Sequence, residues 1–363
     1  MNTAKISNYN KLIAFFLIIV ALLSVLVVSA NGWQDDSPFW DDESDLGNSD
    51  INDKKDPEKS PTDGKEPDAP TETQKYYHHI TGIEIQQEKY GDSQIAYVID
   101  GNSPLCGVTD CNVLIEFPIE SGKTRYVMIS DKGADLVKIG SITYSRYFIS
   151  NLASSFGATV ISLGNDDAVE YEHVNWDEHI LDLKSNAGSY YTEYTYFTYT
   201  SSKLIAKTIL SAPTLSSILP YNFTEGTTDP TTKTVAETIN LPYENSTSLV
   251  YSPDQGKYCL CKHGSDKIDV STPKKVEFTN IFVLYADSMT YETADKTQVV
   301  INTLGSGKGY YAFEGYAEEI TWCMDNEGNL TFKDTNGEKV HIGRGSTYIA
   351  YVKSSKSNVE IFQ

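Results

Sequence analysis

From about residue 236 onward, short strand-forming segments alternate with turn-forming residues about every 8–12 positions. The segments are rich in β-branched and aromatic residues, and the clearest are Ile281–Tyr285, Val299–Leu304, Tyr310–Phe313, Ile320–Met324, Asn329–Phe332 and Thr347–Val352. The sequences Asp-Asn-Glu-Gly at 325–328 and Asn-Gly at 336–337 favour hairpin turns, and we expect another hairpin turn at Gly305–Gly309. This pattern predicts a mainly antiparallel β lobe over residues 236–363.

The preceding part of the body mixes two kinds of element. β-Branched and aromatic residues predict four strands, and these are Gln94–Asp100, Val113–Phe117, Thr124–Ile129 and Thr159–Leu163. Apolar residues at helical spacing predict helices over Tyr144–Phe156 and Ser202–Leu210, the second capped by Ser201 or Ser202. We therefore expect an α/β lobe over 76–235 and an α+β fold for the whole body.

A run of ten residues at 190–199 (YYTEYTYFTY) is unusually rich in tyrosine. An amphipathic strand with one aromatic face explains it, and we prefer that interpretation. A surface that stacks on carbohydrate rings is the alternative.

Residues 12–30 are almost uniformly apolar and long enough to span a bilayer. Lys5 and Lys11 precede this run, and no basic residue follows until Lys54. The positive-inside rule then places the amino terminus in the cytoplasm and the body outside. We favour a retained anchor over 1–34. The alternative is a signal peptide cleaved after Val28-Ser29-Ala30. No cysteine lies near residue 30, so the sequence offers no site for a lipid anchor.

Residues 35–75 are predicted to form an acidic, disordered linker. Within 35–73 there are 14 Asp and Glu against four Lys, five prolines, and almost no large apolar residues after Trp40. Such a composition buries too little apolar surface to offset the entropy of ordering. The whole chain carries a formal charge of −21, which argues against nucleic acid as a partner.

The cysteines do not predict a metal site. Cys259, Cys261 and His263 alternate along one strand and would share a face, but a structural zinc site needs a fourth ligand. Buried thiols explain the pattern better. Cys106 and Cys111 lie close enough in sequence to bridge a loop, although nothing requires it.

The chain has only three arginines, and two of them, Arg125 and Arg146, lie in one short block. Because lysine supplies nearly all other positive charge, these two positions indicate a need for the rigid guanidinium fork. We predict a ligand-binding site from residues in and around this block: Arg146, Arg125, Glu116, Glu120, Thr124 and Asp100. Arg125 is expected to form a structural ion pair with Glu116 or Glu120. Arg146, at the start of a helix, is expected to face an anionic ligand.

The motifs of known enzymes are absent or incomplete. Gly305–Gly309 lacks the spacing of a phosphate-binding loop, and none of the six histidines lies in a motif for nucleophilic catalysis. We therefore name no catalytic residue and no cofactor.

The order of several short segments over about 90–353 resembles the YerB-like family, extracytoplasmic lipoproteins of Gram-positive bacteria without an established reaction. In the first half these segments are Asn102-Ser103-Pro104, the block from Glu116 to Arg125, Ile139-Gly140, Arg146-Tyr147-Phe148 and Thr200-Ser201. In the second half they are Tyr251–Tyr258, Gly305–Lys308, Glu319–Trp322 and Gly337.

The chain departs from the family pattern at several polar positions. Thr143 replaces an expected arginine, Gly164 or Asn165 an expected histidine, and Tyr196-Phe197 part of an expected Pro-His-Asn. The expected Arg-Pro-Gln loop is shortened to 105–110, and the lipobox cysteine is missing. The resemblance thus implies a member that keeps the fold and has lost most of a polar cleft.

Two functions remain. The first is a membrane-tethered, non-catalytic protein of the cell envelope that binds a partner protein or a wall polymer. The second is an envelope enzyme acting on an anionic or wall-derived substrate, with Arg125 and Arg146 holding the anion. Glu116, Glu120 or Asp131 would then supply acid–base chemistry.

Overall fold

The computed structural model describes residues 74–87, 93–166, 180–210, 222–224, 233–293, 296–326, 328–355 and 359–362. The chain divides into two units, residues 1–70 and 71–363, and every described residue belongs to the second. The membrane segment predicted at 12–30 lies outside the described residues, as does nearly all of the linker predicted at 35–75. Within the described ranges, no helix is both long and apolar enough to cross a membrane.

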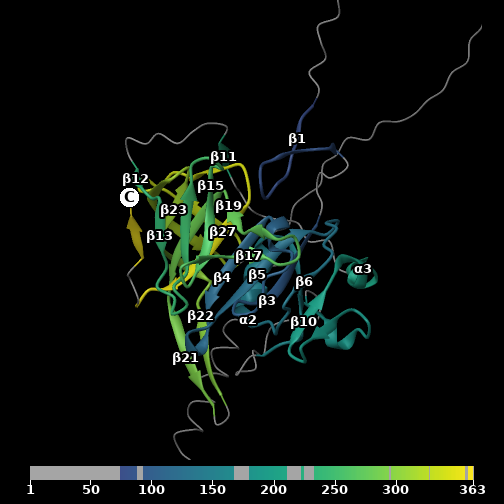
Figure 1. Ribbon diagram of the computed structural model, residues 1–363. Helices are drawn as coiled ribbons and strands as arrows, with labels where there is room; N and C mark the ends of the chain where they lie inside the picture. Colours follow the sequence, from purple (N-terminus) through teal and green to yellow (C-terminus); the bar gives the residue numbers. More distant parts are fainter. Residues whose placement is uncertain are drawn as a thin grey trace, which may run out of the picture. The chain divides into compact units, whose positions relative to one another are not determined.

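One 11-stranded mixed sheet organises the body (Figure 1). Its strands, from one edge to the other, are β12(Thr234–Val235), β24(Tyr316–Met324), β23(Gly305–Phe313), β20(Asn280–Ala286), β27(Thr347–Lys353), β4(Val113–Pro118), β5(Thr124–Asp131), β3(Gln94–Asp100), β7(Ala158–Ser162) and β8(Ile180–Asp182). The remaining strand, β25(Leu330–Lys333), pairs with β24.

Strand β27, near the end of the chain, joins the two halves of the sequence. It lies between β4 and β20 and runs parallel to both, so that Thr347 is opposite Val113 on one side and Asn280 on the other. Strands from before and after residue 236 therefore form one continuous sheet.

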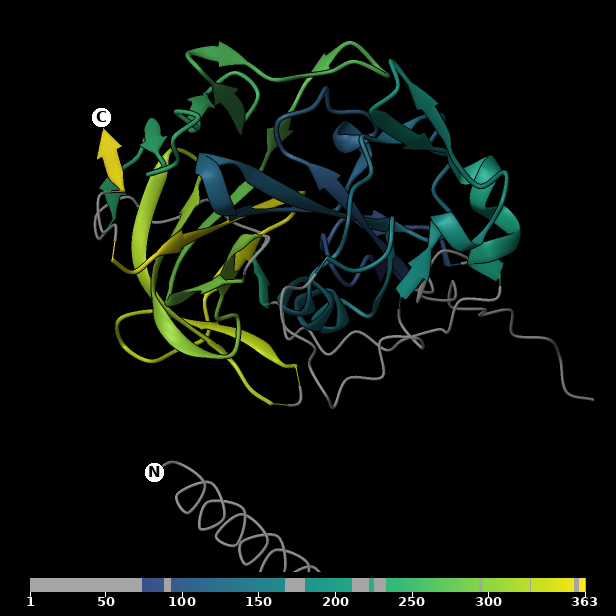
Figure 2. The same cartoon turned by 90° about the horizontal axis from the view of Figure 1, so that it is seen from below.

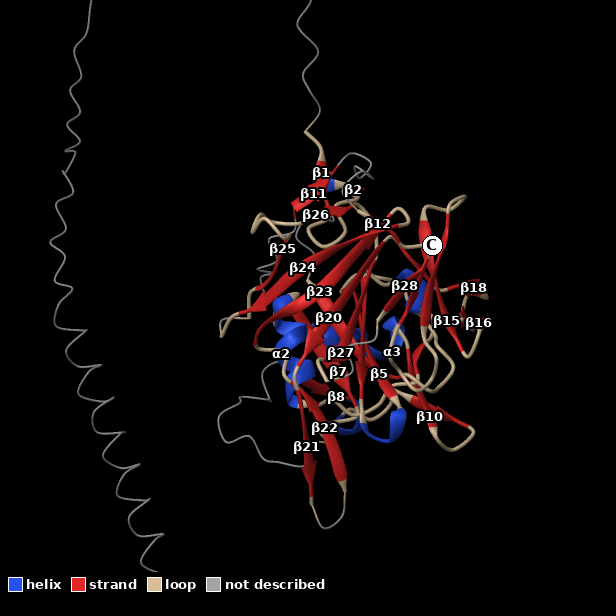
Figure 3. Ribbon diagram, turned by 90° about the vertical axis from the view of Figure 1, so that its left-hand side faces the viewer, coloured by secondary structure: helices blue, strands red, loops and turns tan. Residues whose placement is uncertain are grey.

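The side chains of this sheet alternate between two apolar cores. In β4, Val113, Ile115 and Phe117 belong to the first core, whereas Leu114 belongs to the second. Helix α2(Tyr147–Ser155) packs on the first core, and α3(Ser202–Leu210) contributes Ile205 and Ile209 to the second. Figure 3 shows the two helices on opposite sides of the sheet, and Figure 2 shows α2 against the strands coloured blue.

A smaller, six-stranded sheet covers part of the second core. Its strands are β16(Ser265–Asp266), β15(Lys257–Lys262), β14(Ser248–Ser252), β13(Thr238–Asn240), β28(Glu360–Phe362) and β19(Glu277–Phe278), which pairs with β15. Along β15, Tyr258 and Leu260 face the core, so Cys259 and Cys261 face away from it.

Five minor sheets complete the described part of the chain. One has three strands, β6(Ile139–Gly140), β10(Phe197–Thr200) and β9(Tyr191–Glu193). The others are the pairs β1(Tyr76–Tyr77) with β2(Glu84–Ile85), β11(Asn222–Thr224) with β26(His341–Gly343), β17(Ile268–Asp269) with β18(Lys274–Lys275), and β21(Ser288–Glu292) with β22(Thr297–Ile301).

The structure is richer in β-sheet than the predicted α+β fold, and an α/β first half is not seen. Two nine-residue α-helices lie in the described residues before 236, and both pack on a sheet that dominates the fold. Their positions agree with the sequence, since α3 has the predicted bounds and the Ser201 hydroxyl accepts a hydrogen bond from the Leu204 amide. The prediction overestimated the share of the fold that these two short helices form.

Two local predictions are wrong. Residues 305–309 begin strand β23 and form no turn; a side chain at Gly307 would lie 2.3 Å from the Tyr285 carbonyl oxygen, so glycine allows the close approach of β20. Residues 190–199 form the hairpin β9–β10, not one strand, because Tyr194 and Thr195 reverse the chain with φ values of 51° and 68°.

Candidate functional site

Several strands of the main sheet have their carboxyl ends on the same side of the body. β3 and β4 are both antiparallel to β5, β7 is parallel to β3, and β27 is parallel to β4. The carboxyl ends of β3, β4, β7 and β27 therefore lie at the same end of the sheet. Open mixed and parallel sheets commonly bind ligands there.

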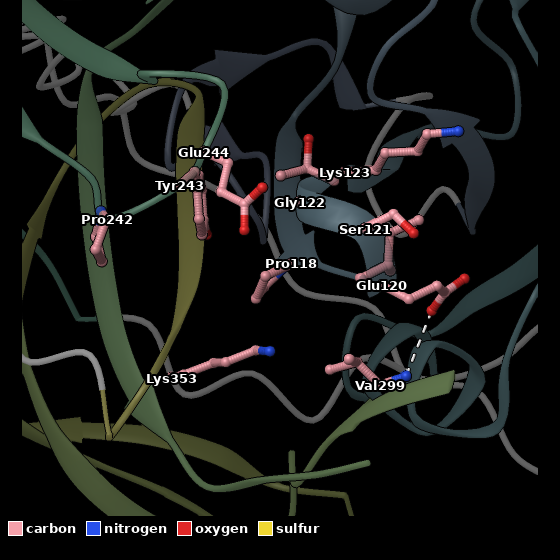
Figure 4. A pocket seen from close by; sticks show the side chains of 12 residues that line it. Pro118, Glu120, Ser121, Gly122, Lys123, Pro242, Tyr243, Glu244, Val299 and Lys353 are labelled. Atoms are coloured by element: carbon pink, nitrogen blue, oxygen red, sulfur yellow. Dashed lines mark hydrogen bonds between the residues drawn. The ribbon is translucent and has the colours of Figure 1, made fainter. Parts of the chain in front are cut away.

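A pocket of about 220 Å³ lies at the carboxyl ends of β4 and β27 (Figure 4). It is lined by residues 118–124 from the β4–β5 connection, 242–244 before β14, Val299 of β22, and Lys353 at the end of β27. The volume is below the range of about 300–1,000 Å³ typical of drug-sized ligands. The pocket therefore suits a small molecule or the end of a longer one.

Two oppositely charged side chains line this pocket and have no partner among the residues that the structure describes. Lys353 is half-buried and Glu244 is exposed, and Figure 4 shows them extending toward the pocket from different sides. Neither makes a hydrogen bond or an ion pair within the described part of the chain. Lys123, also in the lining, extends away from the centre.

Gly122 allows Glu244 to occupy its position. Gly122 has a φ of +67°, and a Cβ built on it would lie 1.8 Å from Glu244 Oε2. Any other residue at 122 would displace this carboxylate and would also strain the backbone. The glycine in the β4–β5 connection thus shapes the acidic side of the pocket.

Glu120 forms another part of the wall and is held firmly. Its carboxylate accepts two hydrogen bonds from Arg146, at 2.9 and 2.6 Å, and one from the Val299 amide at 3.3 Å. Burial raises the pKa of Glu120, but these hydrogen bonds outweigh it, so the net pKa lies below the usual value. Glu120 is therefore a fixed anion.

Arg146 forms the structural ion pair that was predicted for Arg125. Arg146 is fully buried and forms the structural pair with Glu120, and it also donates to the Val299 carbonyl at 3.2 Å. Arg125 is 7% exposed, and its buried Nη1 has no hydrogen-bond partner in the described ranges. Burial and the charge of Arg146 lower the pKa of Arg125 to about 10, against the opposing effects of Asp166, Glu120 and Asp100. The prediction failed because it paired neighbours in sequence, whereas Glu120 turns toward the start of α2.

Glu116 and Thr124 lie on the other face of the sheet, in a buried polar cluster. Glu116 accepts a hydrogen bond from Lys262 at 2.7 Å and another from the Tyr348 hydroxyl. Thr124 Oγ1 accepts from the same ammonium at 3.0 Å, and that ammonium lies 4.6 Å from the centroid of the Tyr126 ring. Glu116 therefore pairs with Lys262, not with the predicted Arg125.

Asp100 ends β3 and stabilises its own turn. Its carboxylate accepts hydrogen bonds from the Asn102 amide at 3.0 Å and from the Ser103 hydroxyl at 2.8 Å. Of the six predicted site residues, Glu120 and Thr124 line the pocket, whereas Asp100, Glu116, Arg125 and Arg146 are not in its lining.

Neither the two pocket charges, Lys353 and Glu244, nor the buried Lys262 was predicted from the sequence. For Lys262 a signal existed, because it follows Tyr258 and Leu260 at alternating positions and so faces the core. No local pattern distinguishes Lys353 and Glu244 from other surface charges.

Comparison with known proteins supports the resemblance noted in the sequence. Residues 238–349 match the family model described as the C-terminal domain of a protein of unknown function (DUF3048). The structure is similar to the crystal structure of the YerB protein from Bacillus subtilis, with a TM-score of 0.66. The likeness covers 79% of this chain and 99% of that one, at 18% sequence identity. The resemblance to the YerB-like family is confirmed. A comparison with curated proteins finds no significant match.

The DUF3048 match begins at 238, the first residue of β13, and ends at 349, within β27. Residues outside the match supply β4, β5 and the Glu120 wall. The pocket is thus built from residues inside and outside the matched region.

Proposed function

We propose that this protein is a membrane-tethered, non-catalytic binding module of the cell envelope. Its pocket at the carboxyl ends of the strands binds a short peptide with free ends, derived from a partner protein or from the peptide part of the wall. Glu244 receives the ammonium end of the peptide and Lys353 receives the carboxylate.

The unpaired charges of Lys353 and Glu244 carry this proposal. Both side chains line one small pocket, and neither is neutralised by a described neighbour. The surrounding wall is rigid, since Glu120 is already held by Arg146 and Val299. A ligand with two charges of opposite sign complements such a pocket, and complementary charge gives specificity.

The state of the carboxylates supports binding over catalysis. Glu120 and Asp131 both have pKa values below the usual range, so both are anions at neutral pH and weak bases. Asp131 lies at the other end of β5, bonded to His78 at 2.8 Å. Glu116 is fully buried against Lys262. The three carboxylates predicted for acid–base chemistry are thus committed to structural contacts.

The proposed location rests on the sequence. The apolar run at 12–30, its basic flank and the acidic linker are arranged as in a tethered extracytoplasmic protein.

Calorimetric titration of the full-length protein with simple peptides tests the proposal. The probes are an unblocked tripeptide of alanine and its N-acetylated, C-amidated and doubly blocked forms. We expect each block to weaken binding by about tenfold, which corresponds to about 1.4 kcal/mol. Glu244→Gln should remove the preference for a free amino end, and Lys353→Gln the preference for a free carboxyl end.

Lys123→Gln is the matched control, because Lys123 belongs to the same lining but extends away from the pocket. It should bind all four peptides as the wild type does. Equal affinity for the four peptides, or no binding of any, would rule out the zwitterionic ligand. Consumption of the peptide during titration would instead support the hypothesis that the protein is an envelope enzyme.

A further inference from the structure

The outward face of β15 gathers two thiols and two carboxylates. Cys259 and Cys261 are two positions apart and so point to the same side of the strand. Across the sheet, Cys261 is opposite Asp266 of β16, and Cys259 is opposite Glu277 of β19. Directly opposite residues of antiparallel strands share a face, with Cβ atoms about 4.5–5.5 Å apart. We call these four residues the thiol–carboxylate patch.

Three of the four potential ligand atoms are already close together. The sulfur atoms of Cys259 and Cys261 and a carboxylate oxygen of Asp266 all lie within 4.8 Å of one another. Cys261 Sγ is 3.3 Å from Asp266 Oδ1. Tetrahedral Zn²⁺ with Zn–S bonds of about 2.3 Å requires ligand atoms about 3.3–3.8 Å apart. Small side-chain rotations therefore suffice to reach that geometry.

We propose that the thiol–carboxylate patch binds a thiophilic divalent cation of the Zn²⁺ class. Cys259 and Cys261 supply two thiolates, Asp266 supplies one oxygen, and Glu277 or a water molecule completes the tetrahedron. The site lies on the side of β15 opposite the core-facing Lys262, so it is separate from the pocket.

The environment of the patch favours a cation over bare thiolates. Lys275 is the cation bonded to Asp266 in this structure, at 2.8 Å, and this pair is exposed and so contributes little. With both thiols ionised, four negative charges would face one lysine, and a divalent cation offsets most of this excess.

The patch is also accessible to a metal ion. Cys259 and Cys261 are buried, whereas Asp266 is exposed and Glu277 is half-buried. An ion can reach the patch from the Asp266 side and lose most of its water against the thiolates. His263, which the sequence placed on the same strand face, is not in the group of close ligand atoms and lies in the turn after β15 with a φ of 51°.

Titration of the reduced full-length protein with Co²⁺, a spectroscopic substitute for Zn²⁺, tests this site. We expect a thiolate-to-cobalt charge-transfer band and the visible bands of a tetrahedral ion, saturating at one Co²⁺ per chain and lost on addition of Zn²⁺. Cys259→Ser or Cys261→Ser should abolish the charge-transfer band. Asp266→Asn should weaken the affinity by at least about tenfold.

Cys323→Ser is the matched control, because Cys323 is an exposed thiol on β24, outside the patch. It should leave the spectrum unchanged, and circular dichroism of every variant checks the fold. Absence of the charge-transfer band in the reduced wild type would overturn the proposal. So would a band that survives Cys259→Ser or disappears in Cys323→Ser.

Discussion

The guanidinium of Arg146 holds both oxygens of the Glu120 carboxylate, with distances of 2.9 Å from Nη1 to Oε2 and 2.6 Å from Nη2 to Oε1. This pair connects the start of α2 to the β4–β5 connection, which forms one wall of the pocket. Through the Val299 amide and carbonyl it also connects both elements to β22. Three segments of the chain thus meet at one ion pair, in which Arg146 is fully buried and Glu120 is partly exposed.

Arg146→Ala should destabilise the protein by about 3 kcal/mol, because it leaves the Glu120 carboxylate without its partner. Arg125→Met should change the free energy of unfolding by less than about 1 kcal/mol, or raise it, since Arg125 Nη1 is buried with no hydrogen-bond partner among the described residues and methionine keeps the apolar stem. Urea unfolding of both variants beside the wild type measures the two changes. Equal and large losses at both positions would contradict this assignment of roles.

The buried cluster around Glu116 gives a second prediction. Glu116 and Lys262 have side-chain exposures of 0% and 5%, and each is the other's charge partner. Lys262→Met and Glu116→Gln should each destabilise the protein, Lys262→Met by about 3–5 kcal/mol because it strands a buried carboxylate. The double variant should lose less than the sum of the single changes, with a coupling energy of about 2 kcal/mol.

Denaturation of the wild type, the two single variants and the double variant measures the coupling energy. Lys233 and Glu318 form a more exposed pair at 2.8 Å and serve as the control cycle, in which the coupling should stay below about 1 kcal/mol. Additive losses at Glu116 and Lys262 would show that the two charges are stabilised separately.

These two clusters also show how far the sequence leads. Enrichment in β-branched and aromatic residues predicts most strands of the main sheet, and β3 has the predicted bounds Gln94–Asp100. The position of β27 between β4 and β20 has no local signal, because strand partners are chosen by packing over long separations. For the same reason, the block that contains Arg125 and Arg146 indicates that Arg146 and Glu120 are important, but it does not predict that they form an ion pair. Lys262 and Glu116 are 146 positions apart, so only the fold reveals their contact.

Asp131 predicts a change in acid stability. Burial raises its pKa, but hydrogen bonds from His78, Gln94 and Asn112 outweigh burial and hold the pKa at about 2. Since this value lies below the unfolded value of about 3.9, ionised Asp131 stabilises the fold above about pH 4. That contribution is lost as the pH falls toward 2. Because the side chain is one-third exposed, we expect about 1 to 1.5 kcal/mol in all.

Urea unfolding of Asp131→Asn and wild type between pH 7 and about pH 2 measures this contribution. The difference between the two proteins should shrink as the pH falls through this window. Asp135→Asn, at an exposed carboxylate, is the control and should differ little from wild type at any pH. A difference for Asp131→Asn that stays constant with pH would mean that ionisation of Asp131 does not stabilise the fold.

The orientation of the chain in the membrane gives the last prediction. Lys5 and Lys11 precede the apolar run at 12–30, so the amino terminus should stay in the cytoplasm and the body should lie outside. Protease added to intact cells stripped of their wall should therefore digest the body from outside, and immunoblotting follows its loss. A cytoplasmic protein in the same cells should remain intact as the control. Survival of the body during this treatment would place it inside the cell and remove the basis for an envelope ligand.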